Sequence, residues 1–126
     1  MAAPSLLFPP SEATDIARDF AAEAALERVR SAAMVARDQI AELPGVRVLG
    51  PEVKSGSESV RLAIDLRDTG RDAWQVVCAM AGRGFTLDAA SNRVIVVRLT
   101  EADRRDATHH RLAPALQIAL WSTPAV

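Results

Sequence analysis

The sequence predicts an α+β two-layer sandwich, in which helices pack on one sheet of three or four mostly antiparallel strands. Three observations predict this class. A long stretch has helical apolar spacing, one later stretch alternates apolar and polar residues as a half-buried strand does, and turn-rich connections between the elements are short. The expected order is α-β-β-α-β-β-α, and 126 residues suit a single domain.

The first element is predicted to be a long helix over residues 15–43, where apolar side chains recur every three or four positions. Residues 1–14 are expected to form an extended lead-in, because two prolines at positions 9–10 do not suit a helix interior. Ser11 or Thr14 is a candidate N-cap. A Pro-Gly pair directly after the helix is expected to end it.

Four strands are predicted from alternation and turn signals. Residues 46–49 suit a short strand, and residues 50–59 are rich in Gly, Pro and Ser, as loops are. Residues 60–67 alternate apolar and polar, so one face of this strand is expected to be buried. Residues 85–88 and 93–99 flank a turn and are expected to pair as a hairpin.

A second helix is predicted over residues 72–81, after a polar turn. Either Asp68 or Thr69 is the candidate N-cap, and this structural role accounts for the turn without catalysis. Gly70 permits tight backbone geometry there. The expected core face of this helix consists of Trp74, Val77 and Ala81, with Met80 beside them.

A last helix is predicted over residues 101–120, and Thr100 with Asp103 resembles a capping box at its start. Pro114 is expected to kink this helix or to split it in two. Residues 121–126 are expected to form a loose tail. The inward side chains of the helix are predicted to be Leu112, Leu116 and Ala119.

Composition excludes several classes of function. A net charge of −1 offers no basic excess for phosphates, so nucleic acid is not an expected partner. No stretch approaches the roughly 20 apolar residues of a membrane helix, and the first ten residues do not read as a signal peptide. A cytoplasmic protein is therefore expected. Cys78 lies in an apolar run, which predicts a buried small side chain rather than a reactive thiol.

The sequence contains no set of residues that forms a reaction centre by itself. His109 and His110 are adjacent, so on a helix they point about 100° apart and suit a shared metal poorly. With Asp103 and Asp106 they are interpreted as a solvated helix start, and no metal site is predicted. Residues 54–59 lack the order of a phosphate-binding loop, and no Gly-x-Ser-x-Gly motif is present.

Three quoted segments carry a resemblance to a known family: "LPGVRVLG", "RLAIDLRDTGRDAWQVVCAMAGRGFTLDAASNRVIVVRLT" and "HRLAPAL". With Pro4-Ser5 and the Asp15-Ile16-Ala17-Arg18 start, this ordered series resembles the C-terminal region of the Orn/Lys/Arg decarboxylases. These enzymes depend on pyridoxal phosphate and have an aspartate-aminotransferase-like fold. The resemblance covers roughly residues 4–120, although no single motif in it is catalytic.

The resemblance implies a small domain over residues 15–120 that covers the active-site cleft and aids assembly. Its implied partners are a large domain that carries pyridoxal phosphate and further copies of itself. The large domain's Ser-x-His-Lys motif is missing, and Lys54 has no His before it, so this chain alone is expected to bind no cofactor and to be inactive.

Asp88 is the one substrate-side candidate that the resemblance implies, at a position where the family tends to Glu. A plain strand-end carboxylate is the competing interpretation of Asp88. Arg71 also departs from the family, which often has an aromatic residue there. The alternative function is a free-standing, non-catalytic interaction module derived from the same domain.

Overall fold

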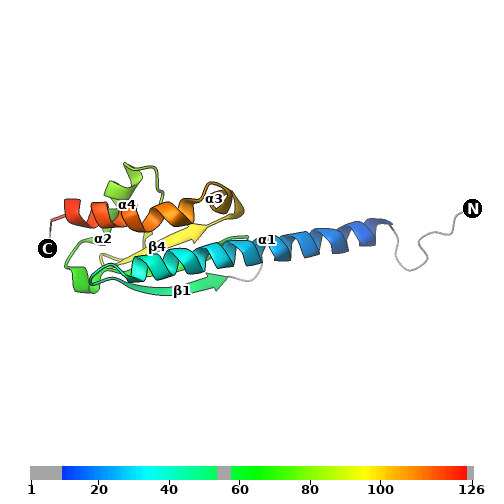
Figure 1. The fold of residues 1–126 in the computed structure, drawn as a ribbon, viewed down its shortest axis with the longest axis horizontal. Helices are drawn as coiled ribbons and strands as arrows, with labels where there is room; N and C mark the ends of the chain where they lie inside the picture. The colour runs from blue at the N-terminus through cyan, green and yellow to red at the C-terminus, as the bar shows by residue number, and fades with distance from the viewer. Residues whose placement is uncertain (1–9, 54–57, 125–126) are drawn as a thin grey trace, which may run out of the picture.

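The protein, described by a computed structural model over residues 10–53 and 58–124, has the predicted α+β architecture (Figure 1). The elements follow the expected order of one helix, two strands, one helix, two strands and a helical end. All strand pairs of the described sheet are antiparallel, and the strand order is β1-β2-β4-β3. The helices pack against one face of this sheet.

Helix α1 spans Pro10–Ala41 and begins earlier than Asp15. The expectation of an extended lead-in is therefore wrong for residues 10–14, while residues 1–9 and the side chains of residues 10–14 lie outside the described part. Proline is compatible with a helix start because the first turn needs no N–H donor there. Figure 1 shows the N-terminal part of α1 running beyond the sheet, and Phe20 on it is 68% exposed.

Strand β1 spans Arg47–Val53, so it continues through residues that were predicted to form a loop. The pairing of β1 with β2 shifts its register between Leu49 and Glu52, which accommodates Gly50 and Pro51 within the strand. The Gly and Pro content predicted a loop here, but β1 lies at the edge of the sheet, where a strand tolerates proline. Lys54 lies outside the described residues.

The remaining strands are β2 (Val60–Asp65), β3 (Asp88–Ala89) and β4 (Val94–Leu99). The predicted hairpin of β3 and β4 is confirmed, but its first strand is Asp88–Ala89 and overlaps the predicted residues 85–88 only at Asp88. Phe85 and Leu87 precede it as buried side chains rather than as ladder members.

The core lies between the helices and the inward face of the two central strands. The core receives every second side chain of these strands, as expected for an antiparallel sheet with one covered face. Its largest fully buried side chains are Val29, Ile40, Val60, Leu62, Ile64, Leu66, Val76, Met80, Ile95, Leu99, Leu112 and Leu116.

Helix α2 spans Ala73–Ala81, and its N-cap is Asp72, whose carboxylate accepts a hydrogen bond from the Gln75 N–H. The prediction of Asp68 or Thr69 as the cap is therefore wrong. Asp68 and Thr69 instead lie in a short 3₁₀ helix, η1, over Arg67–Thr69. Gly70 ends η1 in the left-handed backbone conformation, which glycine adopts without strain, and α2 begins three residues later.

The core face of α2 is centred one residue earlier than predicted, although Met80, expected beside that face, is buried. Its buried residues are Ala73, Val76 and Met80. Trp74 is 56% exposed, and Cys78 is exposed rather than buried. The observed and predicted sets have the same helical spacing, so periodicity alone cannot separate them.

The helical end consists of α3 (Glu101–Arg105) and α4 (Thr108–Ser122). The Thr100–Asp103 capping box is confirmed. The break, however, lies at Asp106–Ala107, where Ala107 has a φ of 57°, and Pro114 lies inside α4.

The C-terminal tail is more ordered than predicted for residues 121–123. Helix α4 continues to Ser122, and Thr123 is buried. The Thr123 hydroxyl donates a hydrogen bond of 2.8 Å to the Ala119 carbonyl. The predicted inward residues of this helix are confirmed as buried: Leu112, Leu116 and Ala119.

Candidate functional site

Asp88, the substrate-side candidate implied by the family resemblance, lies on the side of the sheet that the helices do not cover. Its register partner is Val96 on β4, whose neighbours Ile95 and Val97 point into the core. The Asp88 carboxylate lies 3.9 Å from Nε of Arg98. Both side chains are mostly exposed, so this ion pair is accessible to a partner or a ligand.

The uncovered side of the sheet, called the open face from here on, mixes apolar and charged side chains. Residues directly opposite in an antiparallel pair share a face, which assigns its members from the register. They are Arg47, Leu49, Glu52, Arg61, Ala63, Asp65, Asp88, Val94, Val96 and Arg98.

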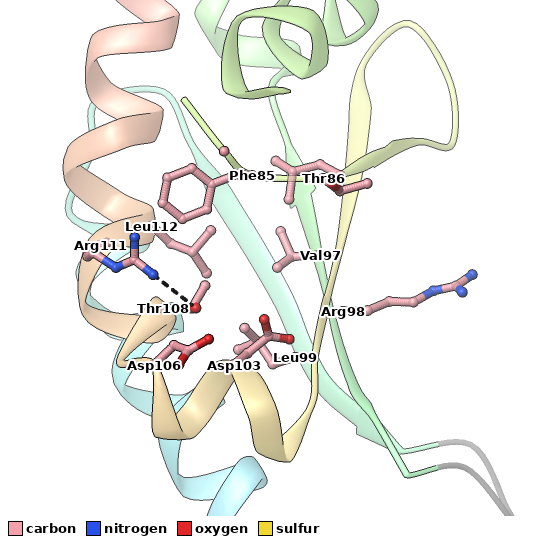
Figure 2. Close-up of a pocket in the computed structure, with 12 residues that line it drawn as sticks. Phe85, Thr86, Val97, Arg98, Leu99, Asp103, Asp106, Thr108, Arg111 and Leu112 are labelled. Carbon is pink, nitrogen blue, oxygen red and sulfur yellow. Dashed lines mark hydrogen bonds between the residues drawn. The ribbon is translucent and has the colours of Figure 1, made fainter. Parts of the chain in front are cut away.

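A cavity of about 340 Å³ lies on the other side of β4, between the segment before β3 and the start of α4. Figure 2 shows Asp103 and Asp106 at one end of this cavity and Phe85 at the other. Arg98 points away from it, toward the open face. Arg98 therefore lines the cavity without directing its guanidinium into it, and Asp88 is not among the lining residues.

Several polar groups of this cavity have partners within the described residues. The Asp103 carboxylate accepts hydrogen bonds from the Thr100 N–H at 2.9 Å and from the Thr100 hydroxyl at 3.0 Å. Arg111 donates to Thr108 Oγ1 at 3.3 Å, and its guanidinium lies 5.6 Å from the Phe85 ring centroid. The first two bonds cap α3, the third lies in the first turn of α4, and none of them positions a nucleophile beside a base.

The histidine pair does not join the cavity carboxylates in one site. The rings of His109 and His110 are 4.2 Å apart. Burial is the main cause that lowers the pKa of His109, and the nearby His110 and Arg104 lower it further. His109 Nδ1 is buried without a hydrogen-bond partner among the described residues, in a hollow between α4 and α1. Among the described residues, no three His, Cys, Asp or Glu side chains lie close enough to hold a metal.

Glu101 lies in an ion cluster that was not predicted from the sequence. Its carboxylate accepts two hydrogen bonds from Arg104, and Arg105 and Arg28 lie 3.5 and 3.8 Å from it. The spacing of Glu101 to Arg104 and Arg105 on one helix is visible in the sequence. The contribution of Arg28, from α1, depends on tertiary packing.

The turn between β2 and α2 serves as a structural joint. Thr69 Oγ1 donates to the Leu66 carbonyl at 2.6 Å and accepts from the Arg71 N–H at 3.1 Å. The Arg71 side chain donates to the Leu120 carbonyl at 3.0 Å, which ties the turn to α4. Arg71, at the position where the resembling family often has an aromatic residue, thus has a packing role here.

The described residues do not fit pyridoxal phosphate as a complete site. The cofactor needs an amine for covalent attachment and an acid beside its ring nitrogen. Lys54, the one lysine of the sequence, lies outside the described residues. Of the two cavity carboxylates, Asp103 is held in the capping box.

Comparisons with known proteins give no assignment. No protein-family model matches the sequence, and no curated protein matches it significantly. Among the described helices, none has an apolar stretch long enough to span a bilayer.

Proposed function

We propose that this chain is the small C-terminal domain of a PLP-dependent Orn/Lys/Arg decarboxylase-like protein. It covers the active-site cleft of a large domain and adds surface for assembly, and it is inactive alone. The large domain supplies the cofactor and its chemistry. The proposal includes a cytoplasmic location and homo-oligomers, and it involves neither nucleic acid nor a membrane.

The observation that carries the proposal is the open face with Asp88 at its edge. The resembling segments fall on one continuous unit, with "LPGVRVLG" entering β1, the long segment running from β2 to β4, and "HRLAPAL" lying in α4. One side of this unit is covered by its own helices. The other side offers apolar and charged groups, among them the substrate-side candidate Asp88, to a larger partner.

The first experiment is to read the DNA upstream of the Met1 codon in the native genome. A reading frame, fused or adjacent, that encodes a PLP-binding domain with a Ser-x-His-Lys motif supports the proposal. Its absence, together with a stable dimer of this chain, favours the alternative, a free-standing interaction module. The exposed Phe20 on the projecting part of α1 gives that module a second apolar surface.

A second experiment tests the inactivity of the chain by itself. The purified chain is mixed with pyridoxal phosphate and reduced with borohydride, and the mass of the product is measured. We expect no stoichiometric adduct at a defined lysine. An adduct at Lys54, or release of carbon dioxide from an amino acid by this chain alone, would refute the proposal.

The role of Asp88 is tested in the assembled enzyme. Asp88→Asn should raise the KM for the amino-acid substrate, because the variant loses a carboxylate on the face offered to the large domain. Asp19→Asn, on the exposed part of α1, is the matched control. Equal kinetics for both variants would leave Asp88 as an ordinary strand-end carboxylate.

A further inference from the structure

The open face is ordered in three rows that cross the strands. The central row contains Leu49, Ala63, Val96 and, at the edge, Asp88. The row on one side of it contains Arg47, Asp65 and Val94. The row on the other side contains Glu52, Arg61 and Arg98.

The central row places apolar surface in the middle of this charged face. Leu49 is 67% exposed, and Ala63 and Val96 beside it are half-buried. A solvated face of an antiparallel sheet is usually polar. A central apolar strip flanked by charges has the anatomy of a protein interface rather than of a sheet face that stays in water.

The charged rows contain side chains that lack partners within the described residues. Arg61 and Arg98 are direct register partners, and like charges in such a pair are destabilising. Arg98 has Asp88 nearby, but the Arg61 side chain makes no hydrogen bond or ion pair with another described residue. The Glu52 carboxylate makes none either, although Glu52 is the register partner of Arg61 on β1.

We propose that the open face, when no large domain covers it, binds a second copy of this chain, with the two sheets stacked face to face. A two-fold axis that lies between the sheets and runs along the central row exchanges the two flanking rows. It brings Arg47 of one protomer over Glu52 of its partner, and Asp65 over Arg61. Leu49 then meets Leu49, so the arrangement pairs opposite charges on both sides of an apolar strip.

The alternative two-fold axis, parallel to the strands, is disfavoured by the same charges. It would place Arg61 of one protomer over Arg98 of its partner, two groups of like sign. The chosen axis leaves one like pair, the two Asp88 carboxylates, at the rim of the interface. Each of these carboxylates already has its own Arg98 at 3.9 Å.

The area of the open face is small for a stable dimer interface. Each strand residue covers an area of about 4.8 Å by 3.3 Å, because these are the strand spacing and the rise per residue. The four strands together therefore present a sheet face of roughly 350 Å² per protomer. A stable interface buries about 800 Å² per partner. The dimer is therefore reversible, it dissociates on dilution, and added salt weakens it because exposed ion pairs are screened.

The test uses two single variants, Arg47→Glu and Glu52→Arg, with sedimentation measured over a range of concentrations at low salt. Each variant alone places like charges over one another at both symmetry-related positions, so each should be monomeric at concentrations where the unaltered chain dimerises. Mixing the two variants should restore a dimer, because the new carboxylate of one variant then faces the new guanidinium of the other, and the second pair remains as it was. Arg83→Glu and Glu42→Arg, exposed and outside the open face, carry the same charge changes and should leave the dimer intact.

A chain that stays monomeric at millimolar concentration would overturn the proposal and indicate that a different protein covers the open face. Dimerisation that the two variants leave unchanged would overturn it as well. Circular dichroism of each variant confirms that it is folded. The inference concerns the open face that the proposed function offers to the large domain, and the second copy takes that place when the large domain is absent. The measurement needs neither cofactor nor large domain, so its failure is distinct from a failure of the decarboxylase assignment.

Discussion

Arg104 donates two hydrogen bonds to the Glu101 carboxylate, from Nε at 3.0 Å and from Nη2 at 2.5 Å. This pair lies in the first turn of α3, and Arg28 of α1 lies 3.8 Å from the same carboxylate. The hydrogen bonding to Arg104 is the main cause that lowers the pKa of Glu101 to about 2, against an opposing effect of desolvation. The cluster thus connects two helices through one ionised group.

Replacing this carboxylate should remove part of the acid sensitivity of the fold. Between the ordinary pKa of 4.5 and about 2, the unfolded chain binds more protons at Glu101 than the folded protein does. Its stabilising contribution is therefore complete above pH 4.5 and declines as the pH falls toward 2. Glu101→Gln should lower the free energy of unfolding at pH 7 and flatten its slope across that window, as measured by urea titrations.

Glu42→Gln is the control for this prediction, because Glu42 is exposed and makes no ion pair with another described residue. It should leave both the stability at pH 7 and the acid slope close to those of the unaltered chain. If Glu101→Gln retains the full slope between pH 4.5 and 2, the cluster does not contribute in the way inferred from its hydrogen bonds.

His109 should make the fold more stable as the pH rises. Its pKa in the folded protein lies below the ordinary 6.5, chiefly because the ring is desolvated, so the unfolded chain binds more protons below that pH. Its contribution is complete above pH 6.5 and is lost as the pH falls through the lowered value. His109→Gln should reduce the difference in unfolding free energy between pH 7.5 and pH 5.

An NMR titration of the imidazole carbons measures the same effect directly. Because His110 and Arg104 both disfavour the charged ring, His110→Gln should raise the pKa of His109 toward its ordinary value. Glu27 and Arg28 of α1 line the same hollow and complete its charged surroundings. An unshifted His109 pKa in the unaltered chain would contradict this prediction.

The observed rotation of α2 is tested by truncating one residue on each of its two faces. Met80 is fully buried, so Met80→Ala should cost about 2–5 kcal/mol of unfolding free energy. Trp74 is exposed, so Trp74→Ala should cost less than about 1 kcal/mol. Urea unfolding measures both costs, and a larger loss for Trp74→Ala than for Met80→Ala would return Trp74 to the core, where the sequence predicted it.

The start of α2 gives a fourth prediction. Asp72→Ala removes the carboxylate that accepts from the Gln75 N–H at 3.2 Å and should cost about 0.5–2 kcal/mol. Asp68→Ala removes a 3.4 Å ion pair with Arg47 between exposed side chains, which is worth less than about 1 kcal/mol. Thermal unfolding of the two variants should therefore show the larger loss for Asp72→Ala. Equal losses would argue against Asp72 as the cap.

Local patterns in the sequence were sufficient for the order of the elements and for the inward residues of β2 and α4. The alternation at Leu62 and Ile64 and the spacing of Leu112 and Leu116 each fit one periodicity, and burial follows it. The Thr100–Asp103 capping box was visible for the same reason, since its hydrogen bonds join residues three apart. The candidate site could not be predicted from such local patterns. Asp88 was singled out only through a family resemblance, and its ion pair with Arg98 depends on the pairing of β3 with β4.

What the sequence by itself determined is therefore the set of contacts that lie within one turn or one strand, because their geometry is repeated every two or 3.6 residues. Tertiary structure decided which of two equivalent faces of α2 is buried, that β1 continues through Pro51, and that Arg28 reaches Glu101. It also decided the three rows of the open face, where Arg47, Glu52, Arg61 and Asp65 come from two strands. Such groupings depend on strand register, which is fixed by packing and pairing between segments far apart in the chain.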